Sequence, residues 1–173
     1  MASYAFVTEW RIEAPIDRVY DAIYDSLAWP DWWPAVRAVA EIRPPTGRTG
    51  IGGVRRYTFK GKLPYTLSFD MTVEQIERPT RLAGRARGEL EGRGLWTLRD
   101  DGGATQVRYD WDIRTNRWWM NLLAPVAGGL FKSNHDFVMR SGAEGICRLL
   151  GGVSGTCAWV QSQGADAAPR ARA

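Results

Sequence analysis

At 173 residues, the chain is long enough to form one domain with a substantial hydrophobic core. Its 23 basic and 19 acidic residues give a formal net charge of +4, an excess too small and too scattered to indicate a nucleic-acid-binding protein. Nine tryptophans are the outstanding feature of the composition, and because each carries a large aromatic surface, they are typical of a large core or an aromatic-lined cavity.

The first elements are a strand and two short helices. Residues 4–13 alternate between apolar and polar side chains, which predicts a strand. Pro15 then suits the first turn of a helix, and apolar residues recur at three- and four-residue intervals through Tyr24. The Trp- and Pro-rich segment that follows predicts a second, short helix over residues 31–39.

A series of short strands follows a loop at residues 43–53, which is rich in Gly and Pro. The GIGG sequence in this loop lacks the spacing of a dinucleotide-binding fingerprint, so it does not predict phosphate binding. Strands are predicted at residues 54–61, 63–77, 81–88, 90–98 and 105–114. Because no helical pattern separates them, we expect an antiparallel meander.

Helical periodicity returns in the last third of the chain. Pro125 and Gly128 are expected to break or bend its first part, whereas residues 131–150 predict one long helix. Residues 151–173 are rich in Gly, Ala and Ser without sustained periodicity, so we expect a flexible tail. The expected organisation is therefore a single domain over residues 1–150 followed by that tail.

No targeting or membrane-spanning segment is expected. The N-terminal residues contain no basic region followed by an apolar run, and the most apolar segment, residues 122–131, is far shorter than the roughly 20 residues that span a bilayer. Cys147 and Cys157 lack the spacing of a zinc site and do not make a disulfide framework. We therefore expect a cytoplasmic protein without stable membrane insertion.

Five short motifs occur along the chain in a defined order: Ala14–Tyr20, Trp29–Pro34, Gly94–Leu98, Val107–Trp111 and Asn134–Met139. With the order of the elements, they resemble the START/SRPBCC superfamily, and in particular its polyketide cyclase/dehydrase and lipid transport branch. The resemblance covers about residues 3–150. It implies an α+β helix-grip fold: a curved antiparallel sheet of about seven strands wrapped on a long C-terminal helix, with two short helices after strand 1. It also implies a hydrophobic cavity between sheet and helix for a lipid-like or polycyclic molecule.

The candidate ligand-binding residues lie on the predicted strands and the long helix. Aromatic side chains on the strands alternate so that they face one layer, where they either form the core or line the cavity. Arg85 could hold a carboxylate or a polyketide oxygen, or could lie exposed on an outer strand face. Asn134 follows the apolar stripe of the helix, and a buried amide needs partners in the sheet or on a ligand. The full set is Tyr57, Phe59, Tyr65, Phe69, Arg85, Trp96, Tyr109, Trp111, Phe131, Asn134 and Val138.

Catalytic candidates are few. His135 is the only histidine, so imidazole acid–base chemistry would have to use it, although its position predicts the edge of the helix. Asp70 lies on the more polar face of its strand, and a solvated outer position is favoured; pointing inward, it would have a raised pKa and could act as an acid or base. One histidine and two cysteines cannot form a zinc or iron site, and GxSxG is absent. We therefore expect no metal and no cofactor.

Two hypotheses about function follow. In the first, the domain binds an apolar small molecule as a carrier or sensor, which predicts a lining with only one or two polar anchors. In the second, it is a polyketide cyclase, aromatase or dehydratase, which predicts that at least two of Asp70, Arg85, Tyr57, Asn134 and His135 meet in one cavity. A weaker third possibility is membrane contact through Trp118, Trp119, Leu122 and Leu123. Nothing in the sequence predicts an oligomeric state.

Overall fold

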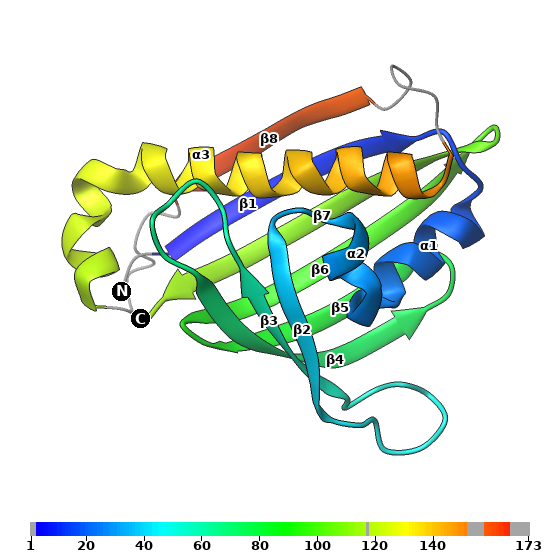
Figure 1. The fold of residues 1–173 in the computed structure, drawn as a ribbon, viewed down its shortest axis with the longest axis horizontal. Helices are drawn as coiled ribbons and strands as arrows, with labels where there is room; N and C mark the ends of the chain where they lie inside the picture. Colours follow the sequence, from blue (N-terminus) through cyan, green and yellow to red (C-terminus); the bar gives the residue numbers. More distant parts are fainter. Residues whose placement is uncertain (1–2, 117, 152–157, 167–173) are drawn as a thin grey trace, which may run out of the picture.

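The computed structural model describes residues 3–116, 118–151 and 158–166. Eight antiparallel strands form one curved sheet in the order β2-β3-β4-β5-β6-β7-β1-β8, and the long helix α3 lies across one of its faces (Figure 1). The elements are β1 (Ser3–Ile12), α1 (Ile16–Tyr24), a 3-10 turn (Ser26–Ala28), α2 (Trp29–Trp32), β2 (Val36–Arg43), β3 (Val54–Phe59), β4 (Leu67–Glu77), β5 (Arg81–Gly88), β6 (Leu90–Asp101), β7 (Ala104–Thr115), α3 (Trp118–Leu149) and β8 (Ala158–Asp166). The predicted α+β helix-grip fold is confirmed.

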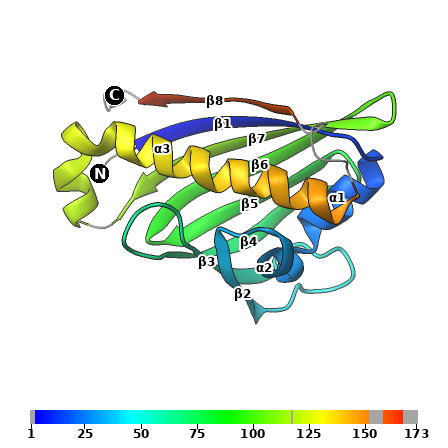
Figure 2. The same ribbon diagram turned by 45° about the horizontal axis from the view of Figure 1, so that its top comes forward.

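The hydrophobic alternation of β1 determines how the sheet meets the helix. Side chains from Tyr4 to Ile12 are alternately buried and half-buried, as a strand with one face on the core requires. Strand β1 pairs with β7, the last strand of the meander, so the first strand extends the sheet rather than forming a separate layer. Figure 2 shows the sheet curving around α3, with the helix running along its concave side.

Two glycines bring α3 close to Trp32, the last residue of α2, and to Trp33, which follows it. A Cβ atom on Gly142 would lie 2.5 Å from the Trp33 indole, and one on Gly145 would overlap the Trp32 carbonyl oxygen. The indole Nε1 of Trp33 donates a hydrogen bond to the Val138 carbonyl oxygen at 2.8 Å. Only glycine permits this approach, so the helix is held against α2 at a fixed position along its length.

The structure differs from the sequence prediction at residues 31–39 and after residue 150. The predicted short helix ends at Trp32, and residues from Val36 onward form the edge strand β2. Residues 158–166, expected in a flexible tail, form β8, which pairs antiparallel with β1. The predicted domain of residues 1–150 stays a prediction.

Helix α3 is one continuous helix from Trp118, which includes the segment where a break was expected. Figure 1 shows its first part set at an angle to the rest, so the bend was predicted correctly and the break was not. Cys147 on α3 is disulfide-bonded, although the sequence predicted no disulfide framework. Within the described residues, none of the helices is long and apolar enough to cross a membrane. The side chains of residues 118–123, considered for membrane contact, lie outside the described part.

Candidate functional site

A cavity lies between the concave face of the sheet and α3, with a volume of about 200 Å³. A single buried water needs only roughly 10–15 Å³ by this kind of measure, so the space exceeds that of a few trapped waters. Its walls come from strands β1 to β7, from α1, α2 and the 3-10 turn between them, and from α3. The cavity is therefore built from residues far apart in the sequence and depends on the complete fold.

Almost all of the predicted ligand-binding residues line this cavity. Those on the strands point to it because side chains alternate between the two faces of a strand, and those on α3 share one stripe of the helix. The lining includes Tyr57, Phe59, Tyr65, Phe69, Trp96, Tyr109, Trp111, Phe131, Asn134 and Val138. Arg85 is the exception. It lies on the outer face of β5, where its Nε donates to Glu74 Oε1 at 2.7 Å, and half of its side chain is exposed.

Stacked rings form the aromatic part of the wall. The rings of Phe59 and Phe69 stack with centroids 5.8 Å apart, and those of Trp96 and Tyr109 stack at 4.0 Å. Gly94 provides the space for this arrangement, because a Cβ atom there would lie 2.5 Å from the Tyr109 hydroxyl. Such flat, rigid surfaces suit contact with planar or elongated apolar molecules.

A polar cluster interrupts the aromatic wall on β3. Arg55 Nη1 donates to Ser26 Oγ at 2.8 Å and to the Tyr24 carbonyl oxygen at 3.3 Å. Ser26 Oγ is in turn 2.7 Å from the Tyr57 hydroxyl. Burial raises the pKa of Tyr57, against smaller opposing effects of its hydrogen bonds and of Arg55, so the hydroxyl stays protonated at neutral pH. The cluster thus presents positive charge and hydroxyl donors to the cavity.

Arg55 has no ion-pair partner among the described residues, in contrast to its neighbour Arg56. Across the β3–β4 ladder, Arg56 is opposite Asp70 whereas Arg55 is opposite Met71. On the other side Arg55 is opposite Glu41, an exposed residue with which it forms no ion pair. Sequence reasoning missed Arg55 and Ser26. The sequence could have predicted Arg55, because it lies two positions before the predicted lining residue Tyr57 and so on the same face of the strand.

Tyr109 contributes a second protonated hydroxyl. Burial raises its pKa well above the ordinary value, with a smaller contribution in the same direction from Tyr57. A neutral phenol can donate one hydrogen bond and accept others, so it can bind a carbonyl or hydroxyl oxygen.

Asn134 and His135 occupy the part of the cavity wall that α3 provides. Asn134 Oδ1 accepts a hydrogen bond from the Leu63 backbone N–H at 3.4 Å, which ties the β3–β4 loop to the helix. The His135 ring stacks on Phe6 with centroids 4.2 Å apart. Its side chain is only 11% exposed, so the expected position at the helix edge was wrong.

The His135 imidazole is buried beside the Asp136 carboxylate. Neither ring nitrogen has a hydrogen-bond partner among the described residues, and Nδ1 is 3.8 Å from Asp136 Oδ1, beyond hydrogen-bond distance. Burial lowers the pKa of His135, and the nearby Asp136 carboxylate opposes this shift. The ring is therefore neutral at neutral pH.

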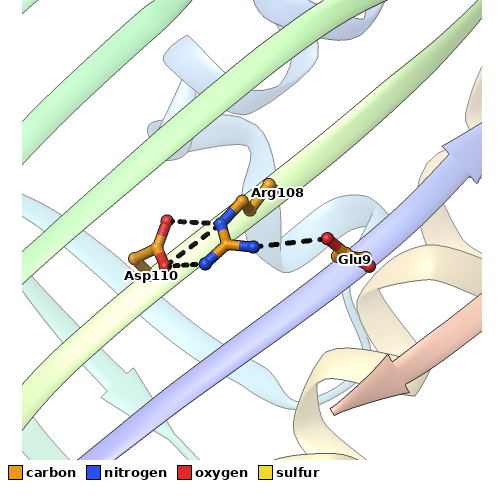
Figure 3. A network of polar contacts seen from close by, with 3 residues as sticks. All are labelled: Glu9, Arg108 and Asp110. Atoms are coloured by element: carbon orange, nitrogen blue, oxygen red, sulfur yellow. Dashed lines mark hydrogen bonds and ion pairs between the residues drawn. The ribbon is translucent and has the colours of Figure 1, made fainter. Parts of the chain in front are cut away.

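Asp70 lies outside the cavity, in the favoured solvated position. It accepts two hydrogen bonds from Arg56, at 2.7 and 2.9 Å, and this pairing holds its pKa below the ordinary value. The same outer face carries a second network, in which Arg108 binds Asp110 at 2.7 Å and Glu9 at 3.4 Å (Figure 3). Asp70 therefore stays ionised, and all three carboxylates lie on the outer face, away from a ligand in the cavity.

Within the described residues, no group of three or more His, Cys, Asp or Glu side chains is arranged to hold a metal ion. The site offers hydrogen-bond donors, the cationic side chains of Arg43 and Arg55, the carboxylate of Glu41 and aromatic surface. This arrangement can bind and polarise oxygen atoms of an otherwise apolar molecule.

Comparisons with known proteins agree with this geometry. A family model described as "Polyketide cyclase / dehydrase and lipid transport" matches residues 4–146. The Zhui aromatase/cyclase from Streptomyces sp. R1128 is 16% identical with a TM-score of 0.67, over 86% of this chain and 94% of that one. A START superfamily protein from Mycobacterium smegmatis is 12% identical with a TM-score of 0.69, over 86% and 97%. A protein from Thermus thermophilus is 17% identical with a TM-score of 0.67, over 84% and 98%.

At these identities, the solved structures show a common fold alone. The search of curated protein sequences found no match.

Proposed function

Because the chain belongs to the polyketide cyclase/dehydrase and lipid transport family, we propose that it binds a hydrophobic small molecule, lipid-like or polyketide-like, in the cavity between sheet and α3. The observation that carries this proposal is Arg55. Its guanidinium lines the cavity, is oriented by Ser26 and the Tyr24 carbonyl, and has no carboxylate partner among the described residues. An otherwise apolar ligand with a carboxylate or carbonyl oxygen at this point would supply the missing acceptor.

The aromatic wall and the polar cluster have different roles in this proposal. The stacked rings of Phe59, Phe69 and Tyr109 provide contact area, which supplies most of the affinity for an apolar body. Arg55 and the protonated Tyr57 hydroxyl select for oxygen and fix the direction in which the ligand enters. Selectivity should therefore depend on Arg55 more strongly than overall apolar affinity does.

A fluorescent probe pair tests this division of roles: anthracene-9-carboxylate and 9-methylanthracene, which share one ring system but differ in charge. Replacing Arg55 with Met should weaken binding of the carboxylate by roughly 10- to 100-fold, the range for a charge-assisted hydrogen bond, and leave methylanthracene binding within about 2-fold. The matched control is Arg56→Met on the same strand, whose guanidinium faces Asp70 outside the cavity. Equal losses in both variants, or no loss in Arg55→Met, would contradict the role of Arg55.

Cyclase, aromatase or dehydratase chemistry is a second candidate, favoured by one specific observation. Of the five polar residues considered for such chemistry, Tyr57, Asn134 and His135 line the same cavity, more than the one or two anchors expected of a simple carrier. Arg55 and Tyr57 would bind a carbonyl oxygen and stabilise the enolate that forms, and the neutral His135, on the α3 side of the same cavity, would accept a proton.

The two candidates differ in turnover. In a cyclase, a carbon–carbon bond forms between an enolate carbon and a carbonyl carbon of the same chain, and one water leaves. Incubating the protein with a linear poly-β-ketone thioester should then give a product lighter by one water, formed faster than with Arg55→Met. Stoichiometric binding of the thioester without any such mass loss would exclude the cyclase and leave the binding function in place.

A further inference from the structure

Strand β3 connects two polar regions of the cavity that lie at opposite ends of an aromatic stretch. Arg55, Tyr57 and Phe59 are at alternate positions and all line the cavity. The next position in this series is Gly61, where a Cβ atom would overlap Asn134 Oδ1. Arg55 and Gly61 are six residues apart, so up to ~20 Å of extended chain separates Arg55 from the point where Asn134 of α3 contacts the β3–β4 loop.

The side-chain amide of Asn134 has a hydrogen-bond partner for its oxygen but none for its nitrogen among the described residues. Its Oδ1 accepts from the Leu63 backbone N–H, which directs the amide plane. Its NH₂ group has no hydrogen-bond partner among the described residues, although Asn134 lines the cavity. A carboxamide presents two N–H donors, so this end of the cavity offers donors without acceptors.

We infer that Asn134 forms a second polar subsite and that the ligand is polar at both ends. An anionic or carbonyl group binds at Arg55, and a second oxygen acceptor binds the Asn134 NH₂ group. The apolar body between them lies along Phe59 and Phe69. This inference rests on the proposed binding function and adds to it the class of ligand: an elongated molecule with an oxygen at each end.

The alternative role for Asn134 is structural. As an acceptor for Leu63 N–H it would hold the β3–β4 loop to α3 and have no part in selectivity. The two roles separate experimentally, because Asn134→Asp keeps an oxygen acceptor for Leu63 but removes both N–H donors. If Asn134 is only structural, Asn134→Asp should keep the preference for the ligand's second oxygen. If Asn134 donates to the ligand, the substitution should remove that preference.

The probes are two series of acids with 8 to 16 carbons: saturated fatty acids, and the same acids with a ketone next to the terminal methyl group. The ketone accepts hydrogen bonds but cannot donate. In the unmodified protein, it should increase affinity by roughly 3- to 10-fold, the usual range for one hydrogen bond. The gain should be confined to one or two adjacent chain lengths, because a fixed separation of the subsites selects one length.

Asn134→Leu and Asn134→Asp should both abolish the difference in affinity between each keto acid and the saturated acid of the same length, whatever the effect of the substitution on the saturated acids themselves. The control is Ser133→Leu, which alters an exposed neighbour on the same helix. A gain that is absent, equal at all lengths, or retained in Asn134→Asp would overturn the second subsite, while the proposed function would stand if the saturated acids still bound through Arg55. If neither series bound the unmodified protein, both the proposed function and the inference would fall.

Discussion

The buried imidazole of His135 should make the stability of the protein depend on pH in a window where few other groups titrate. Because His135 is the only histidine and burial lowers its pKa in the folded chain, the unfolded chain takes up a proton more readily. Stability is therefore complete above the ordinary pKa of 6.5, and it is lost as the pH falls below that value towards the lowered pKa.

The size of the loss is limited by the single proton involved. One proton corresponds to about 1.4 kcal/mol per pH unit, so the free energy of unfolding should fall by at most about 1.4 kcal/mol between pH 7.5 and 5.5. The ring has little means of relieving this penalty by reaching solvent, since only 11% of the side chain is exposed. Lys132 adds to the penalty and Asp136 reduces it.

The measurement is urea denaturation followed by tryptophan fluorescence at pH 7.5, 6.5 and 5.5 and constant ionic strength, for the unmodified protein and for His135→Leu. The variant should show a flatter pH profile. At pH 7.5 it should be at least as stable, because leucine replaces a ring whose nitrogens have no hydrogen-bond partner among the described residues. Parallel profiles for the two proteins would refute the reasoning, since the imidazole would then titrate alike in the folded and unfolded chains.

Two further substitutions test the wall and the outer face. Gly94→Ala places a methyl group 2.5 Å from the Tyr109 hydroxyl and 3.0 Å from the Trp111 ring; it should destabilise the fold by about 1–3 kcal/mol, as overpacking does, and weaken 9-methylanthracene binding in the same preparation. Asp70→Asn breaks an exposed pair with Arg56. It should change the free energy of unfolding by less than about 1 kcal/mol and leave the affinity for the probes unchanged. A large loss of affinity would show that the ion pair on the outer face affects binding in the cavity.

Strands with one buried face could be predicted well, because their side chains alternate. Strand β1 and the aromatic positions of β3, β4, β6 and β7 follow this rule, so the sequence predicted that these side chains share one layer. It did not distinguish a place in the core from a place in the cavity wall. Strand β2 was missed because it is an edge strand with mostly exposed side chains, so it has no apolar period. Strand β8 lacks such a period as well, and its strand conformation depends on pairing with β1.

The face on which a polar residue lies was harder to predict than the strand itself. Arg85 has Gly84 and Ala86 as neighbours, which give little indication of the buried face. Its outward position is fixed by Glu74 on the adjacent strand, and a register shift between Val73 and Gln75 alters the pairing just there. Because cross-strand partners and bulges arise only when strands pair, local sequence does not contain them.

The adjacent arginines Arg55 and Arg56 show how strand pairing turns a common residue into a candidate binding group. The pleat sends their side chains to opposite faces of β3. Register then places Arg56 opposite Asp70, with which it forms an ion pair in solvent. It places Arg55 between Met71 on β4 and Glu41 on β2, and Arg55 forms an ion pair with neither. A slip of β3 by one residue would exchange these two environments, because it would turn Arg56 towards the cavity and Tyr57 and Phe59 towards solvent. The same hydrophobic pattern that specifies the register of the sheet therefore also places a guanidinium without an ion-pair partner among the described residues at the cavity, where a ligand oxygen can bind it.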